Sequence, residues 1–265
     1  MRAARALTTL DGVGSGDHVY WMADTGPGLF VGLEPFAADG ALFGDRLVIV
    51  GSPGLLAEVK RLRAVPASTV MINAWETAGP LASAVEHEMR RAKDAGFHSA
   101  RVLACREPGT HGRTELLDSE LGLDEVAARS GATVVCAYLP GPWNGAELEQ
   151  IMCVHPQTLG SRPGLPGFHM FRSGSKGWKV TGVIDSDGAH AFGSVLRAAV
   201  LHTPAVRLCF GEVDLIDAAG MRALVDAALH LPDRSVVIEG ANRLVRMSWE
   251  LSGFAVPEVP VEVLG

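Results

Sequence analysis

The stretch Val206–Leu229, VRLCFGEVDLIDAAGMRALVDAAL, contains a change of hydrophobic period that decides how the second half of the chain folds. At its start Val206, Leu208 and Phe210 fall on one face, and this period of two is typical of a half-buried strand. Further on, apolar residues recur at the spacing of one helix face, as Met221, Leu224, Val225, Ala228 and Leu229. Asp217 precedes that helix, where its carboxylate can accept from the free N–H groups of the first turn. The stretch therefore predicts a strand, an exposed acidic loop over Asp214–Gly220 and a helix.

Similar strand–helix units lie on both sides of this stretch. Upstream, residues 178–185 form a predicted strand, followed by a helix with Phe192, Val195, Leu196, Ala199 and Val200 on one face. Downstream, the predicted strand Ser235–Gly240 is followed by a helix over Asn242–Gly253. With VTGVID, DLIDAAGMRAL and EGANRLVRMSWELSGF in this order, residues 168–256 resemble the STAS domain of anti-sigma-factor antagonists.

The resemblance implies a protein partner, an anti-sigma factor that is a serine kinase and phosphorylates a hydroxyl residue before the loop glycine. Here Ala219 occupies that position and Ala218 precedes it, so neither residue can accept a phosphate. We therefore expect the loop to bind an anti-sigma factor or a related serine-kinase-like protein without phosphate transfer. The expected partner-binding residues are Asp214, Asp217, Ala218, Ala219, Gly220 and Met221.

Composition and motif spacing limit the other classes of function. The 265-residue chain has 48% apolar residues and a net charge of −7, and it has no large basic cluster, so we expect no nucleic-acid partner. No apolar run approaches the roughly 18 residues of a membrane span, and the first residues lack a signal-peptide core, so we expect a cytoplasmic protein without membrane contact. The four cysteines and nine histidines show no CxxC, HxH or HExxH spacing, so we predict no cofactor and no metal site; a metal site would have to be assembled by the fold.

The first part of the chain also alternates strands with helices. The predicted strands are Val19–Ala23, Arg46–Gly51, Thr69–Ala74, Ala100–Cys105 and Ala132–Tyr138. The predicted helices are Leu29–Phe43, Leu55–Arg63, Leu81–Ala95, Thr114–Ala128 and Ala146–His155. Nearly continuous apolar strands indicate burial on both faces, so we predict a three-layer α/β domain with a mainly parallel sheet. The segment after His155, QTLGSRPGLPG, has no periodicity, and it separates a first domain (1–160) and a linker (161–167) from an α/β second domain (168–265).

Motifs for catalysis or nucleotide binding are absent from this first domain. Gly51-Ser52-Pro53-Gly54 joins a strand to a helix but lacks the GxxxxGK[ST] pattern, and no GxGxxG follows a strand. Ser52, Cys105 and Cys136 lie outside any recognisable nucleophile context. We therefore expect no enzymatic activity. The alternative is a small-molecule enzyme or nucleotide-binding first domain, with the second domain as a docking or oligomerisation module.

Several short motifs of the first domain occur in a recognisable order. They are Gly16-Asp17-His18, Cys105-Arg106-Glu107-Pro108, Ser119-Glu120-Leu121 and the closing VVCAYLPGPWNGAELEQIMCVHP. Over residues 14–160 this pattern resembles the MEDS sensory domain, which implies a degenerate P-loop-like, non-catalytic α/β domain that senses small, hydrocarbon-derived molecules. The candidate ligand-binding residues are Asp24, Trp75, Glu107, Glu120, Tyr138 and His155.

A structural role remains open for part of this signature. Cys136 and Tyr138 are two apart on a strand and can equally be core residues, and His155-Pro156 can simply end the last helix. Together, the two resemblances predict a non-enzymatic signalling regulator. A small apolar ligand in the first domain would control binding of a protein partner by the second domain. The domains are expected to fold separately, and a homodimer is compatible with this organisation.

Overall fold

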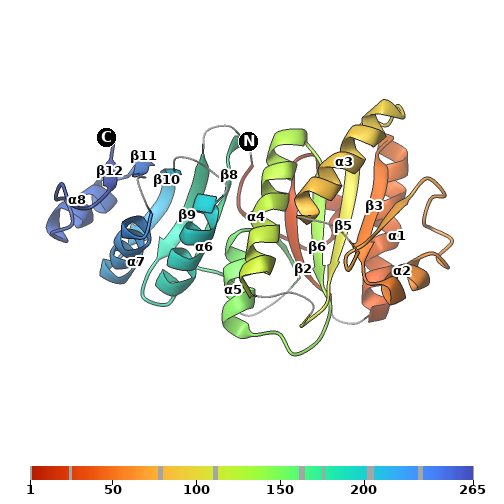
Figure 1. Ribbon diagram of the computed structural model, residues 1–265, viewed down its shortest axis with the longest axis horizontal. Helices are drawn as coiled ribbons and strands as arrows, with labels where there is room; N and C mark the ends of the chain where they lie inside the picture. The colour runs from red at the N-terminus through yellow and green to blue at the C-terminus, as the bar shows by residue number, and fades with distance from the viewer. Residues whose placement is uncertain are drawn as a thin grey trace.

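The computed structural model describes residues 2–23, 26–76, 80–109, 113–160, 165–174, 177–201, 206–231 and 235–264. Two sheets, each with its own helices, lie side by side along the long axis of the molecule (Figure 1). The described helices include none that is long and apolar enough to cross a bilayer.

The first sheet has seven strands in the order β1-β7-β2-β6-β5-β3-β4, and every neighbouring pair is parallel. Its strands are β1 (Arg5–Leu7), β2 (His18–Met22), β3 (Arg46–Gly51), β4 (Val70–Asn73), β5 (Ala100–Arg106), β6 (Thr133–Tyr138) and β7 (Gln157–Leu159). The central strands β5 and β6 are buried along their whole length. The predicted parallel sheet is confirmed.

Helices cover both faces of this sheet. One face carries α1 (Gly26–Phe43) and α2 (Pro53–Val59), preceded in the chain by the short 3-10 helix η1 (Leu10–Gly12). The other face carries α3 (Leu81–Asp94), α4 (Arg113–Ser130) and α5 (Gly145–Cys153). A separate apolar core fills each interface, which is the three-layer α/β arrangement that the sequence predicts.

The second sheet has five strands in the order β12-β11-β10-β9-β8. They are β8 (Phe168–Arg172), β9 (Trp178–Ile184), β10 (Val206–Ile216), β11 (Val236–Glu239) and β12 (Val261–Val263). Only the β8–β9 pair is antiparallel among the described pairs. Helices α6 (Ala189–Leu201), α7 (Ala218–Leu229) and α8 (Arg243–Leu251) contribute residues to its core.

The predicted exposed loop over Asp214–Gly220 is wrong, because most of this segment is regular structure. Strand β10 continues for 11 residues to Ile216, and α7 begins at Ala218, so only Asp217 separates them. Two register shifts between β10 and β9 break the alternation of buried and exposed residues, which hides the strand from a period-of-two pattern. The predicted cap is confirmed: Asp217 accepts from the backbone N–H groups of Ala219 at 2.8 Å and Gly220 at 2.9 Å.

A second correction concerns the segment after His155. Residues Gln157–Leu159 form β7 between β1 and β2, where the sequence predicts no regular structure. The strand is hard to predict because its buried positions include polar side chains. The Gln157 amide donates to Asp17 Oδ1 at 2.8 Å and accepts from the backbone N–H of His18 at 3.2 Å. Residues 161–164 of the predicted linker, with Arg162, lie outside the described residues.

Two helices of the first domain extend the apolar core of the second sheet. Leu117 and Leu121 of α4, with Cys153 and Val154 at the end of α5, belong to the cluster that fills the second sheet. Figure 1 shows α4 and α5 lying beside α6, and α6 contacts both helices. Separate folding of the two domains stays a prediction, and either domain alone would expose this apolar surface to water.

We expect a difference among the four thiols. Cys105, Cys136 and Cys153 are buried, whereas Cys209 is partly exposed. Burial raises the pKa of Cys105 to about 12 and the pKa values of Cys136 and Cys153 well above their usual value. Iodoacetamide on the native protein should therefore modify Cys209 first, as peptide mass spectrometry would show. Alkylation of Cys136 as fast as Cys209 would contradict the burial.

Candidate functional site

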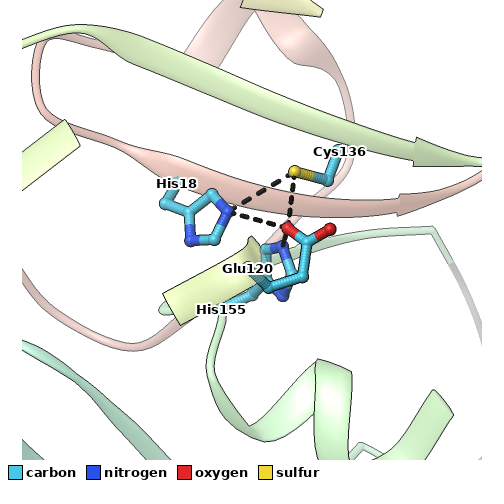
Figure 2. Close-up of side chains that lie close together, drawn as sticks. All are labelled: His18, Glu120, Cys136 and His155. Atoms are coloured by element: carbon cyan, nitrogen blue, oxygen red, sulfur yellow. Dashed lines mark hydrogen bonds and ion pairs between the residues drawn. The ribbon is translucent and has the colours of Figure 1, made fainter. Parts of the chain in front are cut away.

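Four buried side chains meet between the first sheet and its α4–α5 layer. His18, Glu120, Cys136 and His155 each offer one nitrogen, oxygen or sulfur atom, and these atoms all lie within 4.8 Å of one another. Figure 2 shows the two imidazoles and the thiol directed toward the Glu120 carboxylate. We call these four residues the buried polar cluster.

Neighbouring elements bring these residues together. Strands β2 and β6 pair in parallel, so His18 near the start of β2 and Cys136 in β6 come close. Helix α4 packs on the same side of the sheet and carries Glu120, and Asp124 follows one turn later on the same helix face. His155 follows α5, and its Nδ1 donates to the carbonyl of Ile151 at 2.7 Å, which fixes the ring beneath the helix end.

One carboxylate oxygen is the meeting point of the cluster. Glu120 Oε2 lies 2.9 Å from Cys136 Sγ, 3.4 Å from His18 Nε2 and 3.4 Å from His155 Nε2. The thiol donates to this oxygen, and Cys136 Sγ also lies 3.4 Å from His18 Nε2. The two imidazole rings are tilted by 32°, with centroids 3.9 Å apart.

Two arginines balance the charges around the cluster. Arg106 Nη2 lies 2.6 Å from Glu120 Oε1, the second carboxylate oxygen, and donates to Ser119 Oγ at 3.0 Å. Asp124 Oδ1 lies 3.4 Å from His18 Nδ1, and the same carboxylate oxygen accepts from the Arg2 guanidinium at 2.5 Å. Each buried carboxylate thus has a cationic partner, as the cost of burying an isolated charge requires.

The pKa shifts follow from these contacts. Burial alone would raise the pKa of Glu120, but Arg106 and the two histidines outweigh it and hold the pKa well below its usual value. Arg2 and His18 likewise overcome burial and lower the pKa of Asp124 to about 2. Burial and the charge of His18 lower the pKa of His155 to about 4. Burial opposes a charge on His18, but Asp124 and Glu120 raise its pKa.

Two stacked tyrosines lie next to the cluster. Tyr20 and Tyr138 have ring centroids 4.7 Å apart, and Tyr138 meets the His155 ring edge-on at 6.2 Å. Trp143 in turn packs edge-on against Tyr138 at 5.5 Å. Burial raises the pKa of Tyr138 well above its usual value, and the charge of Glu120 adds to this shift. The phenol therefore stays neutral.

The structure brings together three of the six candidate ligand-binding residues, Glu120, Tyr138 and His155. Trp75 is 64% exposed and lies outside the buried cluster, and Asp24 lies outside the described residues. Glu107 accepts from Ser52 Oγ at 2.8 Å. It is separated from the cluster because it directly follows Arg106, and successive side chains along an extended segment point to opposite faces.

Four further residues of this region are missing from the predicted ligand set. They are His18, Cys136, Arg106 and Asp124. The sequence offered a reason to include His18, Arg106 and Cys136, because each belongs to a short motif that resembles the MEDS domain. For Asp124 the sequence holds no signal beyond its position one helical turn after Glu120.

Two cavities adjoin this region. One, of about 810 Å³, is lined by Met22, Trp143 and Met152 of the first domain and by Asp185, Asp187 and Gly188 of the second. The other, of about 610 Å³, lies between α3 and α4 and reaches Arg106 and Ser119. The larger cavity is therefore bordered by both domains, and Trp143 connects its wall to Tyr138.

A family model described as "MEDS: MEthanogen/methylotroph, DcmR Sensory domain" matches residues 17–156, which is more than half of the chain. The chain belongs to the MEDS family. A second model, described as "Mlab, STAS domain", matches residues 174–261. Both expected resemblances are confirmed in their expected order, a sensory domain followed by a domain of a family that acts through protein partners. No curated protein matches the chain.

Polar contacts connect the MEDS domain to the STAS domain directly beside the cluster. Asp124 Oδ2 accepts from the backbone N–H of Arg172 in β8 at 2.6 Å, while Oδ1 of the same carboxylate faces His18 and Arg2. His169 Nδ1, also in β8, donates to the backbone carbonyl of His155 at 2.9 Å. Asp124 and His155 thus contact both the MEDS cluster and a STAS strand.

The start of α7 in the STAS domain offers a smaller surface than the sequence predicts. Asp214 and Ala218 are exposed, and Asp217 and Ala219 are partly exposed. Gly220 and Met221 are buried, and Met221 is 2% exposed within the core. A Cβ on Gly220 would lie 2.7 Å from the carbonyl oxygen of Ile184, so this glycine permits close packing of α7 on β9. These two residues therefore position the surface and do not contribute to it.

Proposed function

We propose that this protein is a non-enzymatic signalling regulator. A small ligand of the MEDS domain controls the binding of a protein partner by the STAS domain. The observation that carries the proposal is that helix α4 belongs to both domains' buried regions. This one helix contributes Glu120 to the buried polar cluster and Leu117 and Leu121 to the STAS core.

The ligand would act through a difference between two states of the protein. A ligand shifts an equilibrium only by its differential affinity for the two states, and the partner must then change ligand affinity by the same factor. The cavity of about 810 Å³ suits this role, since a molecule bound there would contact residues of both domains. Its walls combine apolar side chains such as Met22, Trp143 and Met152 with the carboxylates of Glu149, Asp185 and Asp187, so a small apolar ligand would contact the first group.

Rigid contacts would carry such a change to the STAS domain. Movement of α4 displaces Leu121 in the shared core, and it also displaces Asp124, which holds the backbone of Arg172 in β8. Packed cores adopt discrete arrangements and do not deform continuously, so a small shift of α4 can select a different position of α6.

Binding is favoured over catalysis by the state of the cluster. The thiolate is the nucleophilic form of cysteine, but burial and Glu120 raise the pKa of Cys136 well above its usual value. The thiol is also fully buried, so a substrate would have no access to it in this conformation. A reactive cysteine requires the opposite environment.

The partner surface would be the exposed part of the β10–α7 junction, with Asp214, Asp217, Ala218 and Ala219. The expected partner is an anti-sigma factor of the serine-kinase type. Because Ala218 and Ala219 have no hydroxyl, this partner would bind without phosphorylating the junction. Control would then come from the MEDS domain instead of from phosphate transfer.

We expect Asp217→Arg to abolish partner binding. The substitution places a cation at a helix N-terminus, where negative charge is favoured, and changes the charge of the surface by two units. Calorimetric titration of the full chain with a panel of anti-sigma-factor kinase domains would measure the effect.

Two matched variants separate the surface from the fold. Asp217→Asn keeps a good helix cap, and Glu250→Arg makes the same charge change on the exposed side of α8. Glu250→Arg should bind as the wild type does. Binding of Asp217→Arg with wild-type affinity would remove this junction from the interface. Failure of every kinase domain to bind the wild type would contradict the proposed partner class.

A further inference from the structure

One contact inside the buried polar cluster is unfavourable without a cation. His155 donates from Nδ1 to the carbonyl of Ile151 at 2.7 Å, so in the neutral ring the lone pair is on Nε2. This nitrogen faces Glu120 Oε2 at 3.4 Å, without hydrogen-bond geometry. Two hydrogen-bond acceptors, His155 Nε2 and Glu120 Oε2, therefore face each other, and neither is exposed to water. A cation bound between them would interact favourably with both atoms.

The distances among the four side chains fit a tetrahedral ion. With metal–ligand bonds of about 2.0–2.3 Å, tetrahedral geometry separates neighbouring ligand atoms by roughly 3.3–3.7 Å. Four of the six distances, those from Glu120 Oε2 to the other three atoms and from Cys136 Sγ to His18 Nε2, measure 2.9–3.4 Å, and no pair is more than 4.8 Å apart. Small side-chain shifts that lengthen the short contacts and shorten any beyond about 3.7 Å would place all four atoms in bonding positions.

We propose that His18, Glu120, Cys136 and His155 bind one divalent transition-metal ion, with Zn²⁺ as the best fit. Two imidazole nitrogens, a thiolate and one carboxylate oxygen form a mixed nitrogen, sulfur and oxygen set. Mg²⁺ and Ca²⁺ prefer oxygen ligands alone, whereas Zn²⁺ accepts all three donor types in tetrahedral geometry.

The residues around the cluster support the ligand assignment. A ligating histidine usually donates its other ring N–H to a carbonyl or carboxylate. His155 has the carbonyl of Ile151 at 2.7 Å, and the Asp124 carboxylate faces His18 Nδ1 at 3.4 Å, at ion-pair distance but without hydrogen-bond geometry. Arg106 contacts the other oxygen of Glu120, which leaves Oε2 for the ion. Both imidazoles are therefore oriented with Nε2 toward one point (Figure 2).

Binding of an ion changes the charge of the site by one unit. Binding requires the Cys136 thiolate, so the thiol proton leaves to solvent as the sulfur–metal bond forms. Arg106 and Arg2 already pair with Glu120 and Asp124. The doubly positive ion compensates the new thiolate and leaves one net positive charge beside these two carboxylates.

The test uses the full chain without an affinity tag. The protein is dialysed against a chelator, then against buffer with Zn²⁺ or Co²⁺, and its metal content is measured by mass spectrometry. We expect one ion per chain, and for Co²⁺ an absorption spectrum with tetrahedral ligand-field bands and a thiolate-to-cobalt charge-transfer band. A wild-type protein that keeps no ion would overturn the proposal.

Two serine variants identify the sulfur ligand. Cys136→Ser should lose the charge-transfer band and bind the ion at least about 10-fold more weakly. Cys105→Ser should behave as the wild type does, since Cys105 is a buried thiol on the neighbouring strand whose side chain packs in the core on the opposite face of the sheet. An unchanged band in Cys136→Ser would overturn the assignment.

The measurement also remains decisive if Cys136→Ser does not fold. Only an ion bound through a thiolate gives the charge-transfer band, so its absence from wild-type protein that retains Co²⁺ would refute the site. Loss of this band on alkylation under denaturing conditions and its return in untreated refolded protein would support it. Metal content is independent of partner binding, so the proposed regulation and the metal site fail separately.

Discussion

Replacing Arg106 by methionine is expected to lower the free energy of unfolding by about 3–5 kcal/mol, because it leaves the buried Glu120 carboxylate without its cation. Arg106 is 2% exposed and Glu120 is fully buried. The pKa of Glu120 should rise as its main stabilising charge is removed. Urea denaturation of both proteins at neutral pH would measure the loss.

Arg129→Met is the matched control, because it removes the same group from an exposed ion pair. Arg129 of α4 contacts Glu86 of α3 and Glu125 of α4 at the surface. Exposed pairs contribute about 0–1 kcal/mol, so this variant should stay close to the wild type. Equal losses of unfolding free energy in both variants would show that burial of the Arg106–Glu120 pair does not determine how much the pair contributes to stability.

The second large effect concerns the core that the two domains share. Leu121 of α4 is fully buried and packs with STAS residues, so Leu121→Ala should cost about 2–5 kcal/mol. The same change should also speed up amide hydrogen exchange in α6 and β8, because the space left by the shortened side chain lies where α4 contacts these two elements. Hydrogen-exchange mass spectrometry reports both domains in one experiment.

Leu123→Ala provides the comparison two residues further along α4. Leu123 is equally buried but belongs to the core between α4 and the first sheet. Its loss should be similar in size, with faster exchange concentrated in the MEDS strands. If the two variants loosened α6 and β8 equally, Leu121 would have no special part in coupling the domains, and the proposed route of regulation would be contradicted.

The position of Asp124 gives the buried polar cluster a direct mechanical connection to the STAS domain. Its two carboxylate oxygens divide their contacts, one toward His18 and Arg2 and the other toward the backbone of Arg172 in β8. An occupant that moves His18 therefore also acts on a strand of the second sheet. The proposed metal ion would hold this connection in one geometry, and the proposed ligand in the cavity beside Trp143 would then act on a preorganised framework.

The sequence by itself determined most of the local structure of this protein and the two families that it resembles. Hydrophobic period depends on neighbouring residues in the chain, so the parallel strands, the helices around them and the Asp217 cap could be predicted. Short motifs such as Gly16-Asp17-His18 and the DLIDAAGMRAL segment also indicate the two families, because their residues lie close together in the chain.

The tertiary structure alone decided what those elements bring together. The four side chains of the cluster come from β2, α4, β6 and the segment after α5, and no short spacing in the sequence indicates that they meet. Strand β7 and the long β10 were hidden for a related reason: buried polar side chains and register shifts interrupt the local period. The shared core likewise depends on the packing of α4 and α5 against α6. Contacts between residues distant in the chain are set by packing, and a local pattern contains no information about them.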